Sequence, residues 1–106
     1  MNVDQLFSAP VITVDRASVI FAGKRVADTA ILAADAALIS IEPLITALET
    51  ASRNWSLLHS RQPLPKRVIL QADLSVDLRV PRKVTYSAAR AGYPDVSFAV
   101  NRVARP

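Results

Sequence analysis

Cysteine is missing from the 106 residues, and histidine occurs once, at His59. A chain without cysteine has no disulfide framework, no thiolate zinc site and no cysteine nucleophile. A single histidine also excludes sites that need several imidazoles and argues against a Ser-His-Asp triad. The sequence contains neither a glycine-rich phosphate loop nor a nucleophile elbow. We therefore expect a protein that is not an enzyme and that binds no metal or cofactor.

Long apolar segments are missing too. A transmembrane helix needs about 18–20 consecutive apolar residues, whereas the best candidate, residues 30–41, has twelve and contains Asp35. The first residues also lack the basic and apolar segments of a signal peptide. We expect a soluble domain, either complete or as a piece of a longer protein, in which Asp35 does not relay protons.

The charge of the chain is unevenly distributed. Hydrophobic residues make up 51% of the sequence, which is enough for one domain with a core. Residues 1–51 carry three basic and six acidic side chains, whereas residues 52–106 carry ten basic and three acidic ones. The basic half suggests an anionic neighbour such as nucleic acid, lipid headgroups or peptidoglycan. Alternatively, these side chains only solvate the ends of helices and strands.

The first part of the chain indicates a β-hairpin. Residues 1–10 are expected to be an irregular lead-in. Two runs rich in β-branched residues follow, 11–14 and 17–21, and we expect them to pair around Asp15. Gly23 is expected to provide the positive φ of a tight turn.

An amphipathic helix is predicted after a weakly patterned stretch. Residues 27–29 look like a loop, and the alanine-rich residues 30–40 could be a helical turn or irregular. Ser40 is a plausible N-cap, Pro43 suits the first turn, and the helix should end near His59. Trp55 is expected to be a core residue on the apolar face of this helix. That face is formed by residues that recur at helical spacing: Ile41, Leu44, Ile45, Leu48, Ala51, Trp55 and Leu58.

The second half predicts a strand, a helix and a closing strand. Residues 67–73 form an apolar run typical of a central strand. A helix follows, capped by Asp77 and ended by Gly92, and residues 96–100 form the last strand. The expected fold class is α+β: a two-layer sandwich in ββ-α-β-α-β order, with two helices packed on one face of a mixed sheet.

Residues 67–100, RVILQADLSVDLRVPRKVTYSAARAGYPDVSFAV, resemble the C-terminal periplasmic region of the ExbD/TolR family of biopolymer-transport proteins. Three features match those of the family in order and spacing: the Ala72-Asp73 pair, the helix end at Ala91-Gly92-Tyr93, and the closing strand. Upstream, the hairpin and Gly23 are similar to the family's opening segment, so the resemblance covers roughly residues 11–103. The family-motif positions are Gly23, Asp73, Tyr86 and Gly92.

The resemblance implies a non-enzymatic subunit of a proton-motive-force-driven stator. Its domain would dimerise at the periplasmic face of the inner membrane, anchored by an N-terminal helix that these residues do not contain. It would work with an ExbB/TolQ-type membrane subunit and with a TonB/TolA-type protein or peptidoglycan, for transport or motility across the envelope. Because the membrane helix and its aspartate are not in this chain, we do not expect the chain itself to relay protons. A small basic nucleic-acid-binding module is the alternative.

The closing strand is the predicted dimer interface. If it lies at a sheet edge, its backbone can pair with the same strand of a second copy. Alternatively, the basic tail 101–106 blunts that edge. We expect Asp73 to bond backbone at a turn rather than contact a partner. The predicted interface residues are Val96, Ser97, Phe98, Ala99 and Val100.

Overall fold

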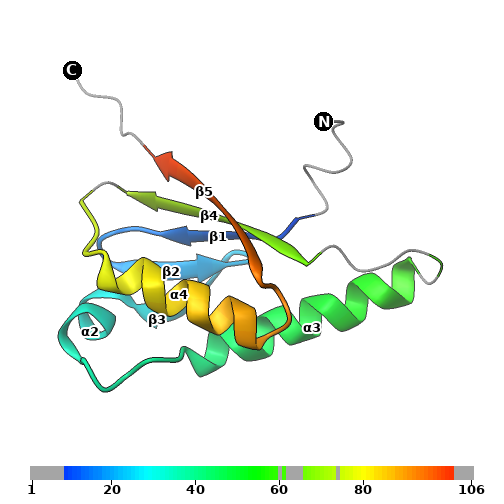
Figure 1. Ribbon diagram of the computed structural model, residues 1–106, viewed down its shortest axis with the longest axis horizontal. Helices are drawn as coiled ribbons and strands as arrows, with labels where there is room; N and C mark the ends of the chain where they lie inside the picture. The colour runs from blue at the N-terminus through cyan, green and yellow to red at the C-terminus, as the bar shows by residue number, and fades with distance from the viewer. Residues whose placement is uncertain (1–8, 60, 62–65, 74, 102–106) are drawn as a thin grey trace.

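A computed structural model of the chain describes residues 9–59, 61, 66–73 and 75–101. Figure 1 shows a single sheet with the helices on one side of it. The elements follow one another as β1 (Val11–Val14), β2 (Ser18–Phe21), β3 (Lys24–Asp28), α2 (Thr29–Ala34), α3 (Glu42–Leu58), β4 (Arg67–Asp73), α4 (Arg79–Arg90) and β5 (Asp95–Asn101).

The sheet has five strands in the order β3-β2-β1-β4-β5. The pairs β1–β2 and β2–β3 are antiparallel, whereas β1–β4 and β4–β5 are parallel. The predicted fold class, an α+β two-layer sandwich with a mixed sheet, is therefore confirmed. The structure adds the third strand, β3, and the short helix α2 to the expected order. Within the lead-in predicted over 1–10, residues 1–8 lie outside the described residues, and β1 begins at Val11 as expected.

Two turns fix the N-terminal strands. The Asp15 carboxylate accepts hydrogen bonds from the backbone N–H groups of Ala17 (2.8 Å) and Ser18 (2.7 Å), which closes the predicted β1–β2 hairpin. Ala22 and Gly23 then have φ values of +56° and +78°. Two successive positive φ values are the signature of a type I′ turn, which matches the twist of antiparallel strands. The role predicted for Gly23 is confirmed.

The residues expected to form a loop, 27–29, are instead the end of β3 and the first residue of α2. The Asp28 carboxylate caps the helix by accepting from the N–H groups of Ala30 (2.9 Å) and Ile31 (3.3 Å). At the other end, the Lys83 ammonium donates to the carbonyl oxygens of Leu32 and Asp35. The loop prediction was wrong because Ala27 and Asp28 pair with β2, and Asp28 also begins the helix as its N-cap.

Helix α3 begins one residue later than Ser40 would place it. Ile41 is the N-cap, and its apolar side chain makes no capping hydrogen bond. Pro43 lies in the first turn, as predicted. The Ser40 hydroxyl bonds the Glu42 carboxylate instead (3.0 Å). The N–H of Ile41 donates to the buried hydroxyl of Ser87 on α4 at 2.8 Å. The prediction of Ser40 as the cap was therefore wrong, because a side chain from another helix takes part of that role.

The predicted apolar face of α3 is buried only in its first three turns. Ile41, Leu44 and Leu48 belong to the core, but Leu58 is 80% exposed and Trp55 is only half-buried. The expectation that Trp55 is a core residue was wrong, and Leu58, on the same predicted face, also lies outside the core. Figure 1 shows the reason: α3 continues past the side of the sheet, so its last turns have no strand to cover them.

Helix α4 ends in the turn that the sequence predicts. Gly92 has φ +98°, and its N–H donates to Ala89 O (3.1 Å) while that of Tyr93 donates to Ala88 O (2.9 Å). These two bonds form a Schellman motif, which favours glycine at the left-handed position. At the start, Asp77 accepts from the Arg79 N–H (2.9 Å), although Leu78 is the N-cap.

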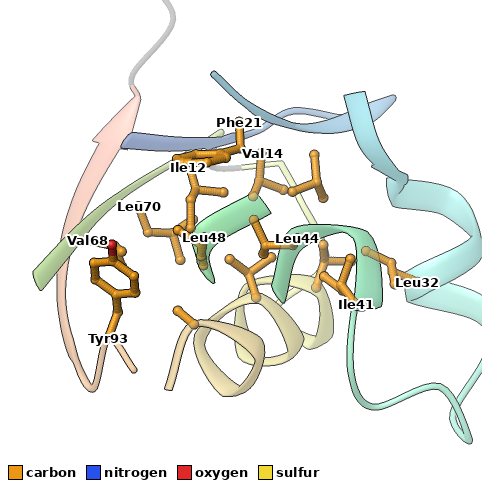
Figure 2. Close-up of a cluster of buried hydrophobic side chains, with 14 of the residues drawn as sticks. Ile12, Val14, Phe21, Leu32, Ile41, Leu44, Leu48, Val68, Leu70 and Tyr93 are labelled. Atoms are coloured by element: carbon orange, nitrogen blue, oxygen red, sulfur yellow. The ribbon is translucent and has the colours of Figure 1, made fainter. Parts of the chain in front are cut away.

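The core lies between the sheet and the helices (Figure 2). In the parallel and antiparallel registers, Phe21 lies opposite Ile12, and Ile12 lies opposite Leu70. The side chains of these three residues form a row across the strands on the helix side of the sheet, where Leu44 and Leu48 of α3 pack against them. The other face of the sheet carries no helix (Figure 1).

Candidate functional site: an exposed edge strand

Strand β5 forms one edge of the sheet. Within the described part of the chain it pairs with β4 alone. The N–H of Asp95 donates to Lys66 O at 3.1 Å, toward β4. Because successive residues of a strand turn their amides to opposite sides, the backbone groups of Val96, Phe98 and Val100 point to the open edge. The edge placement on which the dimer prediction depends is confirmed.

Phe98 ends the cross-strand row that runs through the core. Its register partner is Leu70, and the row continues through Ile12 to Phe21. The three inner side chains are at most 7% exposed, whereas Phe98 is 63% exposed. The row therefore leaves the core at β5 with a large aromatic side chain that no described helix covers.

The remaining side chains of β5 divide between the two faces of the sheet. Val96 is half-buried against the core cluster. Ser97 and Ala99 are exposed and alternate with it onto the face without helices. The side chain of Val100 and the tail beyond Asn101, which was the alternative means of protecting this edge, lie outside the described residues.

The turn at Asp73 is tied to the loop that follows β1. Asp73 Oδ1 accepts from the N–H and from the hydroxyl of Ser75, each at 2.9 Å. The hydroxyl oxygen of Ser75 in turn accepts from Arg16 Nε at 2.8 Å. The carboxylate thus bonds backbone at the strand–helix turn, as expected, and holds that turn against the β1–β2 hairpin.

The other motif positions do not gather around β5. Gly23 lies in the β2–β3 turn at the far side of the sheet, and Gly92 ends α4. Tyr86 is 47% exposed on the outer face of α4. Gly23, Asp73 and Gly92 therefore act in turns, and among the predicted site residues only Phe98 and its neighbours on β5 lie at an unpaired sheet edge.

Tyr93, which follows Gly92, belongs to the core rather than to a surface. It is 1% exposed and lies beside Val68 in Figure 2. Burial raises the pKa of its phenol, and a side-chain hydrogen bond with Ser52 opposes that shift.

Several basic side chains are held within the molecule. Arg79 pairs with Asp77 at 2.8 Å, and Arg90 with Glu42 at 3.6 Å. The side-chain hydrogen bond from Arg79, followed by the bond from its N–H, holds the pKa of Asp77 at about 2. Together with Lys83 at the end of α2, these contacts pair three basic residues of the second half with acidic or carbonyl groups of the same chain.

Among residues 9–59, 61, 66–73 and 75–101, no group of three or more potential metal ligands converges. None of the helices formed by these residues has the length and hydropathy needed to cross a bilayer. Comparison of the chain with protein-family models, with curated proteins and with solved structures finds no match. The family resemblance therefore depends on the motifs of the sequence alone.

Proposed function

We propose that this chain is the periplasmic dimerisation and anchoring domain of an ExbD/TolR-like stator subunit, which supports transport or motility driven by the proton motive force. The observation that carries the proposal is the open edge of β5 with Phe98 exposed beside the core. The order of strands and helices agrees with the one that the resemblance implies. In this role the domain performs no chemistry and acts by holding a second copy of itself.

The outward backbone groups of β5 suggest a specific pairing. In an antiparallel pair of β5 strands related by a two-fold axis at Phe98, Val96 of each copy would face Val100 of the other. All three residues present their amides to the edge, so the bonding pattern of an antiparallel ladder can form. The two sheets would then be continuous, and the β5 edge of each copy would be covered by that of the other.

This register also extends the hydrophobic row. The two Phe98 side chains would lie on the helix side of the joined sheet, with Cβ atoms about 5 Å apart. Each ring would continue the row that begins at Phe21, Ile12 and Leu70. Aromatic cross-strand pairs stabilise sheets in addition to the area that they bury.

The variant Phe98→Lys tests the proposal. It removes two apolar side chains from each dimer, worth about 1.5–3 kcal/mol apiece, and places two like charges opposite each other. We therefore expect dimer dissociation to increase by about 10²–10⁴-fold, measured by sedimentation equilibrium. Ile31→Lys is a matched control, because Ile31 is 57% exposed on α2, away from the edge, and it should leave the mass unchanged. A dimer that survives Phe98→Lys, or a wild-type protein that is monomeric at all concentrations, would contradict the proposal.

The proposed partners are an ExbB/TolQ-type membrane subunit and a TonB/TolA-type protein or peptidoglycan. The alternative, a small basic nucleic-acid-binding module, is less well supported because Arg79, Lys83 and Arg90 bond acidic or carbonyl groups of the same chain. Binding to duplex or single-stranded DNA that weakens steeply with salt would favour the alternative over the stator role.

A further inference from the structure

The end of α3 carries the most exposed large apolar side chains in the described part of the molecule. Leu57 is 81% and Leu58 is 80% exposed. The core contribution of this helix ends with Leu48 and the partly buried Ala51. The last two turns therefore present leucines that no element of the described residues covers, where polar residues would normally be found.

Trp55 joins this surface and is held in place. It is half-buried, and its ring stacks on that of His59 with centroids 4.3 Å apart and an interplanar angle of 18°. The His59 N–H donates to Trp55 O at 2.9 Å. Because Leu58 follows Trp55 at i+3, these two side chains share one side of the helix, whereas Leu57, at i+2 from Trp55, lies on the other side of the same helix end.

The charges around this helix end have one sign. From residue 50 to residue 72 the sequence has four basic side chains, Arg53, Arg61, Lys66 and Arg67, and no acidic one. Arg53 lies one helical turn before Leu57, and both Arg53 and Arg61 are exposed. A ring with a polar N–H, two exposed leucines and flanking arginines is the combination that binds the headgroup region of bilayers.

We propose that the end of α3, with Trp55, Leu57 and Leu58 flanked by Arg53 and Arg61, docks on an anionic lipid surface. The leucines enter the boundary between headgroups and acyl chains, and the arginines contact lipid phosphates. The occupant is a bilayer rather than a nucleic acid, because the two leucines add apolar area that a phosphate backbone would leave exposed. The inference does not depend on the proposed dimer, since β5 contributes nothing to this surface.

The binding is expected to be weak. Burial of each leucine should raise the association constant for the bilayer about tenfold, and each arginine should raise it about fivefold. The resulting association constant remains below that of a single myristoyl chain, which is on the order of 10⁴ M⁻¹. A titration must therefore reach high lipid concentrations. Trp55 is the only tryptophan of the chain, so its fluorescence reports on this surface alone.

The experiment titrates the full chain with vesicles of phosphatidylcholine mixed with phosphatidylglycerol in equal parts, and with vesicles of phosphatidylcholine alone. We expect a blue shift of Trp55 emission with the anionic vesicles only, and its reversal as salt screens the charges. Leu57→Ser combined with Leu58→Ser should weaken binding by about 100-fold. Leu78→Ser is the matched control, because Leu78 is 73% exposed at the start of α4, and it should bind as wild type does.

Far-UV circular dichroism of the double variant shows whether α3 still folds. No shift at the highest lipid concentration would overturn the proposal, as would equal shifts with neutral and anionic vesicles. A shift with duplex DNA but not with vesicles would assign the surface to nucleic acid instead. The monomer expected of Phe98→Lys retains the end of α3 and should keep the vesicle response, so failure of the dimer and failure of lipid docking are distinguishable.

Discussion

The hydroxyl of Ser87 joins the two main helices, and its removal by Ser87→Ala gives the sharpest test of how they are held together. Ser87 is fully buried. Its hydroxyl oxygen accepts a hydrogen bond from the N–H of Ile41 (2.8 Å), and the hydroxyl donates to Lys83 O (2.8 Å). The alanine variant leaves the Ile41 N–H, at the start of α3, buried without this partner.

The cost follows from that single unsatisfied donor. A buried polar group without a hydrogen bond costs about 1–3 kcal/mol, and the better helix propensity of alanine recovers at most ~0.5 kcal/mol. We expect the free energy of unfolding to fall by about 1–2 kcal/mol. For a domain of this size the melting temperature should fall by about 4–8 °C per kcal/mol.

Urea denaturation followed by far-UV circular dichroism measures the change. Ser56→Ala is the matched control, because Ser56 is an exposed serine of α3, and its effect should stay within about 0.5 kcal/mol. If Ser87→Ala were equally neutral, water or a shifted backbone would have to satisfy Ile41, and the proposed connection between α3 and α4 would be refuted.

Three further predictions concern the other stabilising contacts. Gly92→Ala should lower the free energy of unfolding by about 1–2 kcal/mol. The cause is backbone strain at φ +98°, since an added Cβ would have no atom within 4 Å to clash with. Gly92→Asn should recover part of this loss in the same urea titration. Lys83→Met should lower stability by about 1–2 kcal/mol and speed amide exchange in α2, because the carbonyls of Leu32 and Asp35 lose their donor; unchanged exchange would contradict the capping role. Since burial raises the pKa of Tyr93, the folded state keeps the phenol proton longer than the unfolded state. Its contribution is complete below the unfolded pKa of about 10 and is lost as pH rises through the folded pKa. Thermal melts above about pH 10 should therefore show a steeper loss of stability than those of Tyr93→Phe, and identical slopes would rule out this linkage.

The elements that the sequence predicts best are those with a complete local signal. The β1–β2 hairpin has two β-branched runs and an aspartate at the turn, and α4 has a glycine at its end whose conformation few other residues adopt. Helix α3 is predicted by its apolar spacing. Each of these signals lies within a few residues of the structure that it specifies.

The errors arise where distant residues decide. The short helix α2 depends on Lys83, and the start of α3 depends on Ser87, and neither contact has a local pattern. Periodicity predicts which side of α3 is apolar, but it does not indicate where the sheet beneath that side ends. For this reason Trp55 was predicted as a core residue. Similarly, the alternation of β5 is the same for a central strand as for an edge strand, so its place at the edge comes from the topology.

Amide hydrogen exchange along β5 tests the central claim most directly. Ser97 and Ala99 point their amides at β4, whereas Val96 and Phe98 point theirs at the open edge. If two copies pair through this edge, the amides of Val96 and Phe98 should become protected as the protein concentration rises, while those of Ser97 and Ala99 are protected at every concentration. Fast exchange of the Phe98 amide in a sample that sediments as a dimer would place the contact elsewhere and contradict the account.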